Sequence, residues 1–125
     1  MPAKSSSKRI LIVEDEHPLA HALELKLTHE GYDVATAATG AAGLKAALDD
    51  GSFALILLDL ILPEMDGFAV LQGLKAKKCK TPVVVLSNLG QDEDRRKAKE
   101  LGAKDYLVKS NAPLSEIVAL VKSLV

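Results

Sequence analysis

Five short apolar runs, separated by segments of helix length, constrain the fold of this chain more than any other feature. Several runs are rich in Val and Ile and are bounded by turn residues, which is typical of β-strands. They predict strands over residues 9–13, 33–37, 53–58, 82–86 and 104–108. Three of the runs are almost continuously apolar, as expected for parallel strands that are covered on both faces.

The segments between these runs carry helical patterns. Amphipathic spacing, an N-cap candidate at Asp66 and glycines at positions 31, 51 and 102 predict where helices begin and end. Helices are expected over approximately residues 18–30, 41–49, 67–77, 92–101 and 114–124. Strict alternation of strands and helices predicts an α/β fold, a doubly wound (βα)5 sandwich with a five-stranded parallel sheet and right-handed crossovers.

Composition limits the class of protein. With 125 residues, 48% of them apolar and 26% charged, the chain is expected to form one globular domain. We expect that domain over residues 8–125, after a disordered lead over residues 1–7. A formal net charge of -1 gives no general attraction to nucleic acid or anionic membranes. The single cysteine, Cys79, and the lack of a signal peptide or membrane-length apolar run favour a cytoplasmic protein.

Polar residues gather where the predicted strands end. An unpaired carboxylate in an apolar interior costs several kcal/mol, yet Asp59 directly follows the apolar run 53–58. The first strand is followed by Glu14, Asp15 and Glu16, the fourth by Ser87 and Asn88, and the fifth by Lys109 and Ser110. Ligands of open α/β sheets bind outside the carboxyl ends of the strands, so we expect Asp59 at the mouth of a crevice rather than in the core.

This set of residues indicates a specific chemistry. Glu14, Asp15 and Asp59 repel one another unless a cation joins them, and a small site of hard oxygen ligands suits Mg²⁺. Lys109 adds a positive charge and Ser87 a hydroxyl group. A carboxylate nucleophile with a metal, a lysine and a hydroxyl fits phosphoryl transfer to Asp59, which gives an aspartyl phosphate.

Four segments on these strand ends resemble the receiver domain of two-component response regulators. They are VEDE at 13–16, LLDLILPEMDG at 57–67, VVVLSN at 83–88 and GAKDYLVKS at 102–110. The resemblance implies a flavodoxin-like sheet of order 2-1-3-4-5. It also implies that Asp59 is the phosphoacceptor, that Ser87 and Tyr106 form the switch, that Lys109 contacts the phosphoryl group, and that Glu14, Asp15, Asp59 and the backbone carbonyl of Ile61 bind Mg²⁺.

The resemblance also implies a place in a phosphorelay. A histidine kinase or histidine phosphotransfer protein would phosphorylate Asp59 in the presence of Mg²⁺. Phosphorylation would switch the face of the fourth helix, fifth strand and fifth helix toward a downstream protein target, in a monomer or a phosphorylation-dependent dimer. Such a domain catalyses only its own phosphorylation and dephosphorylation, and no direct contact with nucleic acid or membrane is expected.

The sequence departs from the family pattern after the lysine, where Ser110 replaces the usual proline. The positions two residues after Asp59 and after Ser87 hold Ile61 and Leu89, and these apolar side chains predict slow self-dephosphorylation because they screen the phosphoryl group from water.

Four other functions are weighed against this one. A flavodoxin-like cofactor binder needs a phosphate loop where this chain has EDE, and a haloacid dehalogenase phosphatase needs an aspartate where it has Ile61. A partner-binding pseudo-receiver would lack one of Asp15, Asp59 and Lys109, and the sequence has all three. A DNA-binding regulator would need an output domain in addition, so this chain would then be a fragment of one.

Overall fold

The structure, a computed structural model, describes residues 8–125, so the expected lead over residues 1–7 lies outside the described residues. Strands and helices alternate along the chain as predicted. The strands are β1 (Arg9–Val13), β2 (Asp33–Ala37), β3 (Leu55–Leu58), β4 (Val83–Ser87) and β5 (Asp105–Val108), and the helices are α1 (His17–His29), α2 (Gly40–Asp50), α3 (Gly67–Ala76), α4 (Asp92–Glu100) and α5 (Leu114–Leu124). A short 3₁₀ helix, Lys109–Asn111, follows β5.

The five strands form one parallel sheet of order β2-β1-β3-β4-β5, which confirms the predicted architecture. The register decides which residues meet at its carboxyl edge. Val13 pairs with Leu58, so the residues that follow β1 and β3 lie side by side. Ser87 pairs with Val108, so the ends of β4 and β5 also coincide.

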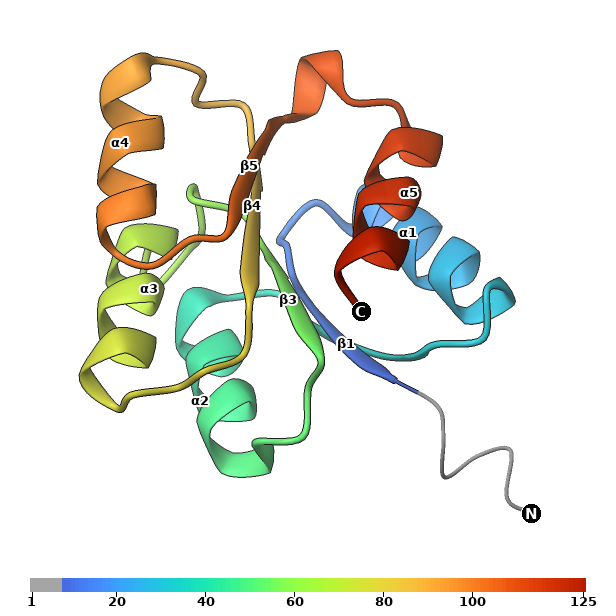
Figure 1. The fold of residues 1–125 in the computed structure, drawn as a ribbon, viewed down its shortest axis with the longest axis horizontal. Helices are drawn as coiled ribbons and strands as arrows, with labels where there is room; N and C mark the ends of the chain where they lie inside the picture. Colours follow the sequence, from blue (N-terminus) through green and yellow to red (C-terminus); the bar gives the residue numbers. More distant parts are fainter. Residues whose placement is uncertain (1–7) are drawn as a thin grey trace.

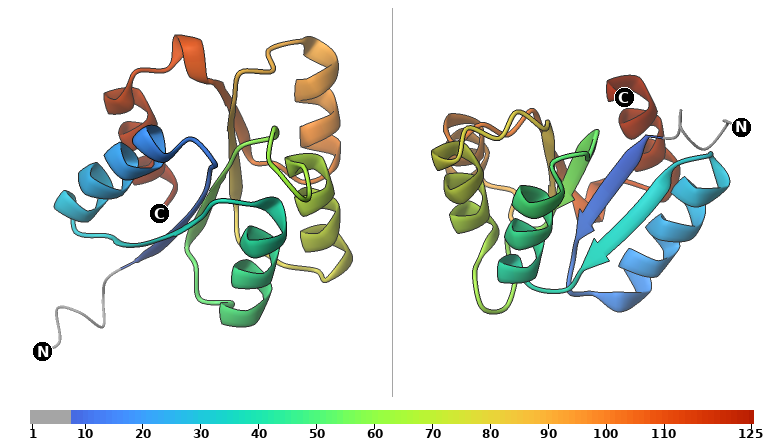
Figure 2. Two further views of the ribbon diagram at one scale, coloured as in Figure 1. Left: turned by 180° about the vertical axis from the view of Figure 1, so that it is seen from behind. Right: turned by 90° about the horizontal axis from the view of Figure 1, so that it is seen from below.

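Helices cover both faces of the sheet. Helices α1 and α5 lie on one face, and α2, α3 and α4 lie on the other (Figures 1 and 2). Alternate strand residues supply two separate cores, and this explains why the three central strands, β1, β3 and β4, are almost continuously apolar. The core under α1 and α5 includes Ile10, Ile12, Leu55, Leu57, Val84 and Leu86, and the core under the other helices includes Leu11, Val13, Ile56, Leu58, Val83 and Val85.

The ends of the elements follow the expected local chemistry. The Asp66 carboxylate caps α3, because its Oδ1 accepts a hydrogen bond from the Ala69 amide at 2.9 Å. Gly51 ends α2 with φ at 70°, a left-handed conformation that glycine adopts without strain.

The third strand is shorter than predicted, since β3 begins at Leu55. Phe53, expected in that strand, instead packs beneath Arg9, with the guanidinium carbon 4.5 Å from the ring centroid.

Helix α4 is the least embedded of the five helices. Its only buried residue is Ala98. Lys97 lies over the Phe68 ring of α3 with its Nζ 4.3 Å from the centroid, so a cation–π contact adds to the little apolar packing there. Over residues 8–125, none of the helices combines the length and apolar character that crossing a membrane requires.

Candidate functional site

Asp59 lies at the carboxyl edge of the sheet, directly after β3. Its amide donates a hydrogen bond to the Val13 carbonyl at 3.0 Å, which extends the β1–β3 ladder by one step. The residue is 4% exposed. The amide of Ile61 donates to Asp59 Oδ1 at 3.2 Å, so the loop after β3 holds one side of the carboxylate in place.

The acidic residues predicted to bind a metal come together. Glu14 is buried and Asp15 is exposed, and one carboxylate oxygen from each of Glu14, Asp15 and Asp59 lies within 4.8 Å of the others. The amide of Glu16 donates to Glu14 Oε2 at 3.0 Å and fixes that side chain. Three hard oxygen donors at this spacing match the ligand preference of Mg²⁺.

Lys109 reaches the same cluster from the start of the 3₁₀ helix. Its Nζ lies 2.9 Å from Glu14 Oε1 and 2.9 Å from Asp59 Oδ2, and it also donates a hydrogen bond to Glu16. The side chain is only 9% exposed. Residues 8–125 contain no cis peptide bond, so the Lys109–Ser110 peptide is trans. Serine in the place of the usual proline therefore leaves the lysine inside the site.

Burial and charge shape the protonation of the cluster. Burial raises the pKa of Glu14 to about 7, and the nearby Asp59 charge adds to the rise, against hydrogen bonds from Lys109 and the Glu16 amide. Burial alone would lower the pKa of Lys109, but hydrogen bonds with Glu14, Glu16 and Asp59 outweigh it and raise that pKa. Lys109 is therefore a fixed positive charge among a larger number of carboxylates, and the site has an excess of negative charge that favours a cation.

A cavity of ≈ 290 Å³ opens beside Asp59. It is lined by Asp15, Glu16, Asp59, Ile61, Asn88 and Lys109. The Ile61 side chain is 56% exposed at this opening. Leu89 instead packs in part against the core under α2, α3 and α4. Glu16 and Asn88 also line the cavity, although their residue types alone predict no role there and only their positions directly after strands point to this edge.

The two predicted switch residues meet through Leu89. Ser87 is fully buried at the end of β4, and its Oγ accepts a hydrogen bond from the Leu89 amide at 3.4 Å. The Tyr106 hydroxyl donates to the Leu89 carbonyl, and its ring is 9% exposed. Among the described residues no hydrogen bond joins Ser87 to Asp59. Ser87 and Tyr106 are thus linked to each other by one residue of the β4–α4 loop.

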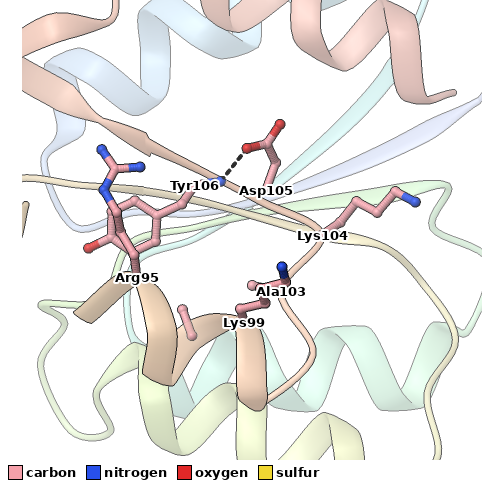
Figure 3. Close-up of a pocket in the computed structure, with 7 residues that line it drawn as sticks. Arg95, Lys99, Ala103, Lys104, Asp105 and Tyr106 are labelled. Atoms are coloured by element: carbon pink, nitrogen blue, oxygen red, sulfur yellow. Dashed lines mark hydrogen bonds between the residues drawn. The ribbon is translucent and has the colours of Figure 1, made fainter. Parts of the chain in front are cut away.

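Tyr106 also borders an outer pocket of ≈ 220 Å³ between α4 and β5 (Figure 3). The Arg95 guanidinium carbon lies 5.1 Å from the Tyr106 ring centroid, which places a cation over the ring. Burial raises the pKa of the Tyr106 hydroxyl above its ordinary value. The inward ring therefore supports α4 from one side while its hydroxyl is bound to the loop that leads to Ser87.

Residues 10–122 match the family model of the response regulator receiver domain. The chain belongs to this family. The match covers β2 to β5, all of β1 except Arg9, and most of α5, so the receiver domain accounts for nearly the whole described structure.

Relatives and solved structures agree with this assignment. The transcriptional regulatory protein SrrA of Staphylococcus aureus (strain NCTC 8325 / PS 47) is 39% identical over 118 residues, which is 94% of this chain and 48% of that protein. The uncharacterized transcriptional regulatory protein YkoG of Bacillus subtilis (strain 168) is 38% identical over 114 residues, 91% of this chain and 49% of that protein. This receiver domain spans about half the length of these curated relatives.

The fold is also similar to the folds of solved receiver domains. The BeF3-activated N-terminal receiver domain of RstA from Klebsiella pneumoniae superposes with a TM-score of 0.84 at 26% identity, over 94% of this chain and 97% of that one. The protein is therefore a receiver domain of the two-component response regulators, with the sheet order expected from its sequence.

Proposed function

We propose that Asp59 of this receiver domain accepts a phosphoryl group from a phosphohistidine of a histidine kinase or a histidine phosphotransfer protein. The observation that carries the proposal is the Asp59 carboxylate itself, which is 4% exposed yet borders the cavity at the sheet edge. An Asp59 oxygen forms a bond to phosphorus while the N–P bond of the donor breaks. The electron pair of that bond stays on the imidazole, which takes up a proton.

The chain's own residues prepare Asp59 for this step. The Ile61 amide and Lys109 each bind one of its oxygens, so the nucleophile is held in one orientation before the donor arrives. Lys109 keeps a positive charge at the point where phosphoryl oxygens gather. Asp59 belongs to the same chain that positions it, so the domain would catalyse only its own phosphorylation and dephosphorylation.

Glu14, Asp15 and Asp59 would hold Mg²⁺ together with the backbone carbonyl of Ile61. The mutual approach of the three carboxylates within 4.8 Å supports this ligand set. When bound, the ion neutralises charge on the phosphoryl oxygens. Glu14 is bound by Lys109 as well, so we assign the more direct contact to the exposed Asp15 and a water-mediated contact to Glu14.

Ser87 and Tyr106 would transmit the phosphorylation to the surface. A phosphoryl group on Asp59 offers new acceptor oxygens, and a shift of the Ser87 hydroxyl toward them would disturb the Leu89 contacts that also hold Tyr106. The response would be a shift in the populations of conformations of the α4–β5–α5 face, to which a downstream protein target binds. The receiver domain itself would act as a monomer or as a phosphorylation-dependent dimer. We propose that this phosphorylation and target binding take place in the cytoplasm, without direct binding of the domain to nucleic acid or membrane.

Slow self-dephosphorylation is the second part of the proposal. Ile61 lines the cavity, so water would meet an apolar side chain next to the phosphoryl group. Leu89 packs in part against the core under α2, α3 and α4, and it would add to this screening from the loop beyond Ser87. Phosphoryl decay of Ile61→Ala and Leu89→Ala variants tests this. Faster decay in both variants is expected, and decay unchanged from the wild type would contradict it.

Intact-mass spectrometry after incubation with acetyl phosphate tests the acceptor proposal. A single phosphoryl adduct is expected with Mg²⁺ and not with EDTA, and Asp59→Asn should abolish it. Asp66→Asn is the matched control, because Asp66 lies in the same loop and asparagine also caps helices well. An adduct that persists in Asp59→Asn would refute the acceptor assignment, and no adduct on folded wild type would indicate a pseudo-receiver.

A further inference from the structure

The ammonium group of Lys109 has three N–H donors, and three carboxylates surround it. Glu14 and Asp59 each lie 2.9 Å away, and Glu16 takes the remaining direction. The first two side chains are 3% and 5% exposed, whereas the Glu16 side chain is 56% exposed. The lysine is thus fully engaged before any phosphoryl group is present, and one of its partners is far more exposed than the others.

The side chain of Glu16 does not cap the helix that it precedes. It is the residue at the N-cap of α1, yet its side chain makes no hydrogen bond to the first amides of that helix. The carboxylate instead reaches Lys109, 93 residues further along the chain. Glu16 also lines the ≈ 290 Å³ cavity together with Asp59, so a phosphodonor must pass beside it.

We infer that Glu16 is the displaceable partner of Lys109, and that it restrains phosphorylation of Asp59 by anionic donors. The inference rests on the function proposed above. For Lys109 to bind a phosphoryl oxygen, one carboxylate must leave it. Releasing Glu14 would leave a buried charge without its partner, which is costly. Glu16 is exposed, so water replaces the lysine at little cost.

Acetyl phosphate allows a direct test because the donor is itself an anion. In the reaction an Asp59 oxygen bonds to phosphorus, the bond between phosphorus and the acetyl oxygen breaks, and acetate leaves with the electron pair. The carboxylate of Glu16 opposes this approach in two ways. It occupies a donor of Lys109, and it adds a negative charge to the wall of the cavity.

The experiment measures the second-order rate constant of phosphorylation with Mg²⁺ and acetyl phosphate, by intact-mass spectrometry at low and high salt. Glu16→Gln should raise it about three- to tenfold at low salt, the effect of one removed charge at a partly exposed site. The gain should shrink at about 1 M salt, where the screening length is ~3 Å. A change in folding alone would not show this salt dependence. Glu16→Ser removes the same charge and supplies an N-cap to α1, so it guards against a loss of stability.

Two comparisons make the outcome decisive. Glu24→Gln on α1 is the control, since Glu24 has no ion pair among residues 8–125, and its rate should match the wild type. In a Lys109→Gln background the gain from Glu16→Gln should be clearly smaller, because only the charge on the cavity wall is then removed and no donor of Lys109 is released.

An unchanged or lower rate in Glu16→Gln and Glu16→Ser would overturn the inference while leaving Asp59 as the acceptor. An equal gain in both backgrounds would also overturn it. If the wild type takes up no phosphoryl group, the proposed function fails and the inference fails with it.

Discussion

Replacing Lys109 with methionine would reveal how the buried charges of the site are balanced. The lysine side chain is 9% exposed and pairs with Glu14 and Asp59, which are 3% and 5% exposed. Methionine keeps much of the length and apolar surface of the stem but removes the ammonium group. At a pH well above the raised pKa of Glu14, two buried carboxylates then face each other without a cation when Mg²⁺ is withheld.

The size of the effect follows from the geometry. Oxygens of Glu14 and Asp59 approach within 4.8 Å. Two unit charges at about 4.8 Å repel by roughly 3.5 kcal/mol at an effective dielectric constant of ~20. Removing one partner of a buried ion pair costs about 3–5 kcal/mol in general, which agrees with this figure. We therefore expect the free energy of unfolding of Lys109→Met to fall by about 3–5 kcal/mol.

Urea denaturation in EDTA, followed by far-UV circular dichroism, measures this loss. With an m-value of about 1–3 kcal/mol per molar urea, the midpoint should fall by roughly 2 M. Lys104→Met is the control, because Lys104 is exposed directly before β5 and its substitution should change the midpoint little. Adding Asp59→Asn to Lys109→Met should recover about 2–3 kcal/mol by removing the repulsion. A Lys109→Met protein as stable as the wild type, or a double variant no more stable than the single, would show that Lys109 does not offset the charges of Glu14 and Asp59.

Three further substitutions probe the surroundings of the site. Glu64 has φ at 70°, so Glu64→Gly should relieve left-handed strain and raise the free energy of unfolding by about 0.5–1 kcal/mol, and a lower urea midpoint would contradict this. A Cβ on Gly67 would lie 2.4 Å from the Asp59 carbonyl oxygen. Gly67→Ala should therefore destabilise the fold by about 1–3 kcal/mol and slow phosphorylation by acetyl phosphate, and a wild-type rate would show that the loop tolerates the methyl group. Lys122 binds Glu30 at 3.0 Å and its hydrogen bond lowers the pKa of Glu30, so Lys122→Ala should lower the urea midpoint slightly at neutral pH. That difference should vanish as the pH falls through the lowered pKa of Glu30, and a difference that persists in acid would point to lost packing instead.

The sheet and its two covered faces could be predicted because the strands are buried on both sides. That burial requires apolar residues at successive positions, a pattern that periodicity detects. The bounds of β1, β2 and α5 match the prediction to the residue. Phe53 was placed in a strand because it is apolar, but its contact with Arg9 depends on packing between distant residues, which no local pattern records.

The candidate site, like the fold, could be predicted from the sequence only in part. The strand ends predicted which residues share the edge of the sheet, since parallel strands bring their carboxyl ends together. The individual hydrogen bonds depend on side-chain rotamers and loop geometry. The Glu16 contact with Lys109 and the bonds of Ser87 and Tyr106 to Leu89 therefore emerged only from the structure. The left-handed backbone of Glu64 is another such feature, because no glycine marks it in the sequence.

Locating the phosphoryl group on the chain tests whether Asp59 is the acceptor. The protein is incubated with acetyl phosphate and Mg²⁺, the acyl phosphate is reduced with borohydride, and the tryptic peptides are sequenced by mass spectrometry. Reduction converts a phosphorylated aspartate into homoserine. We expect homoserine at position 59, dependent on Mg²⁺ and absent without the phosphodonor. Homoserine at Asp15 or Asp66 instead, or none in the folded protein, would contradict it.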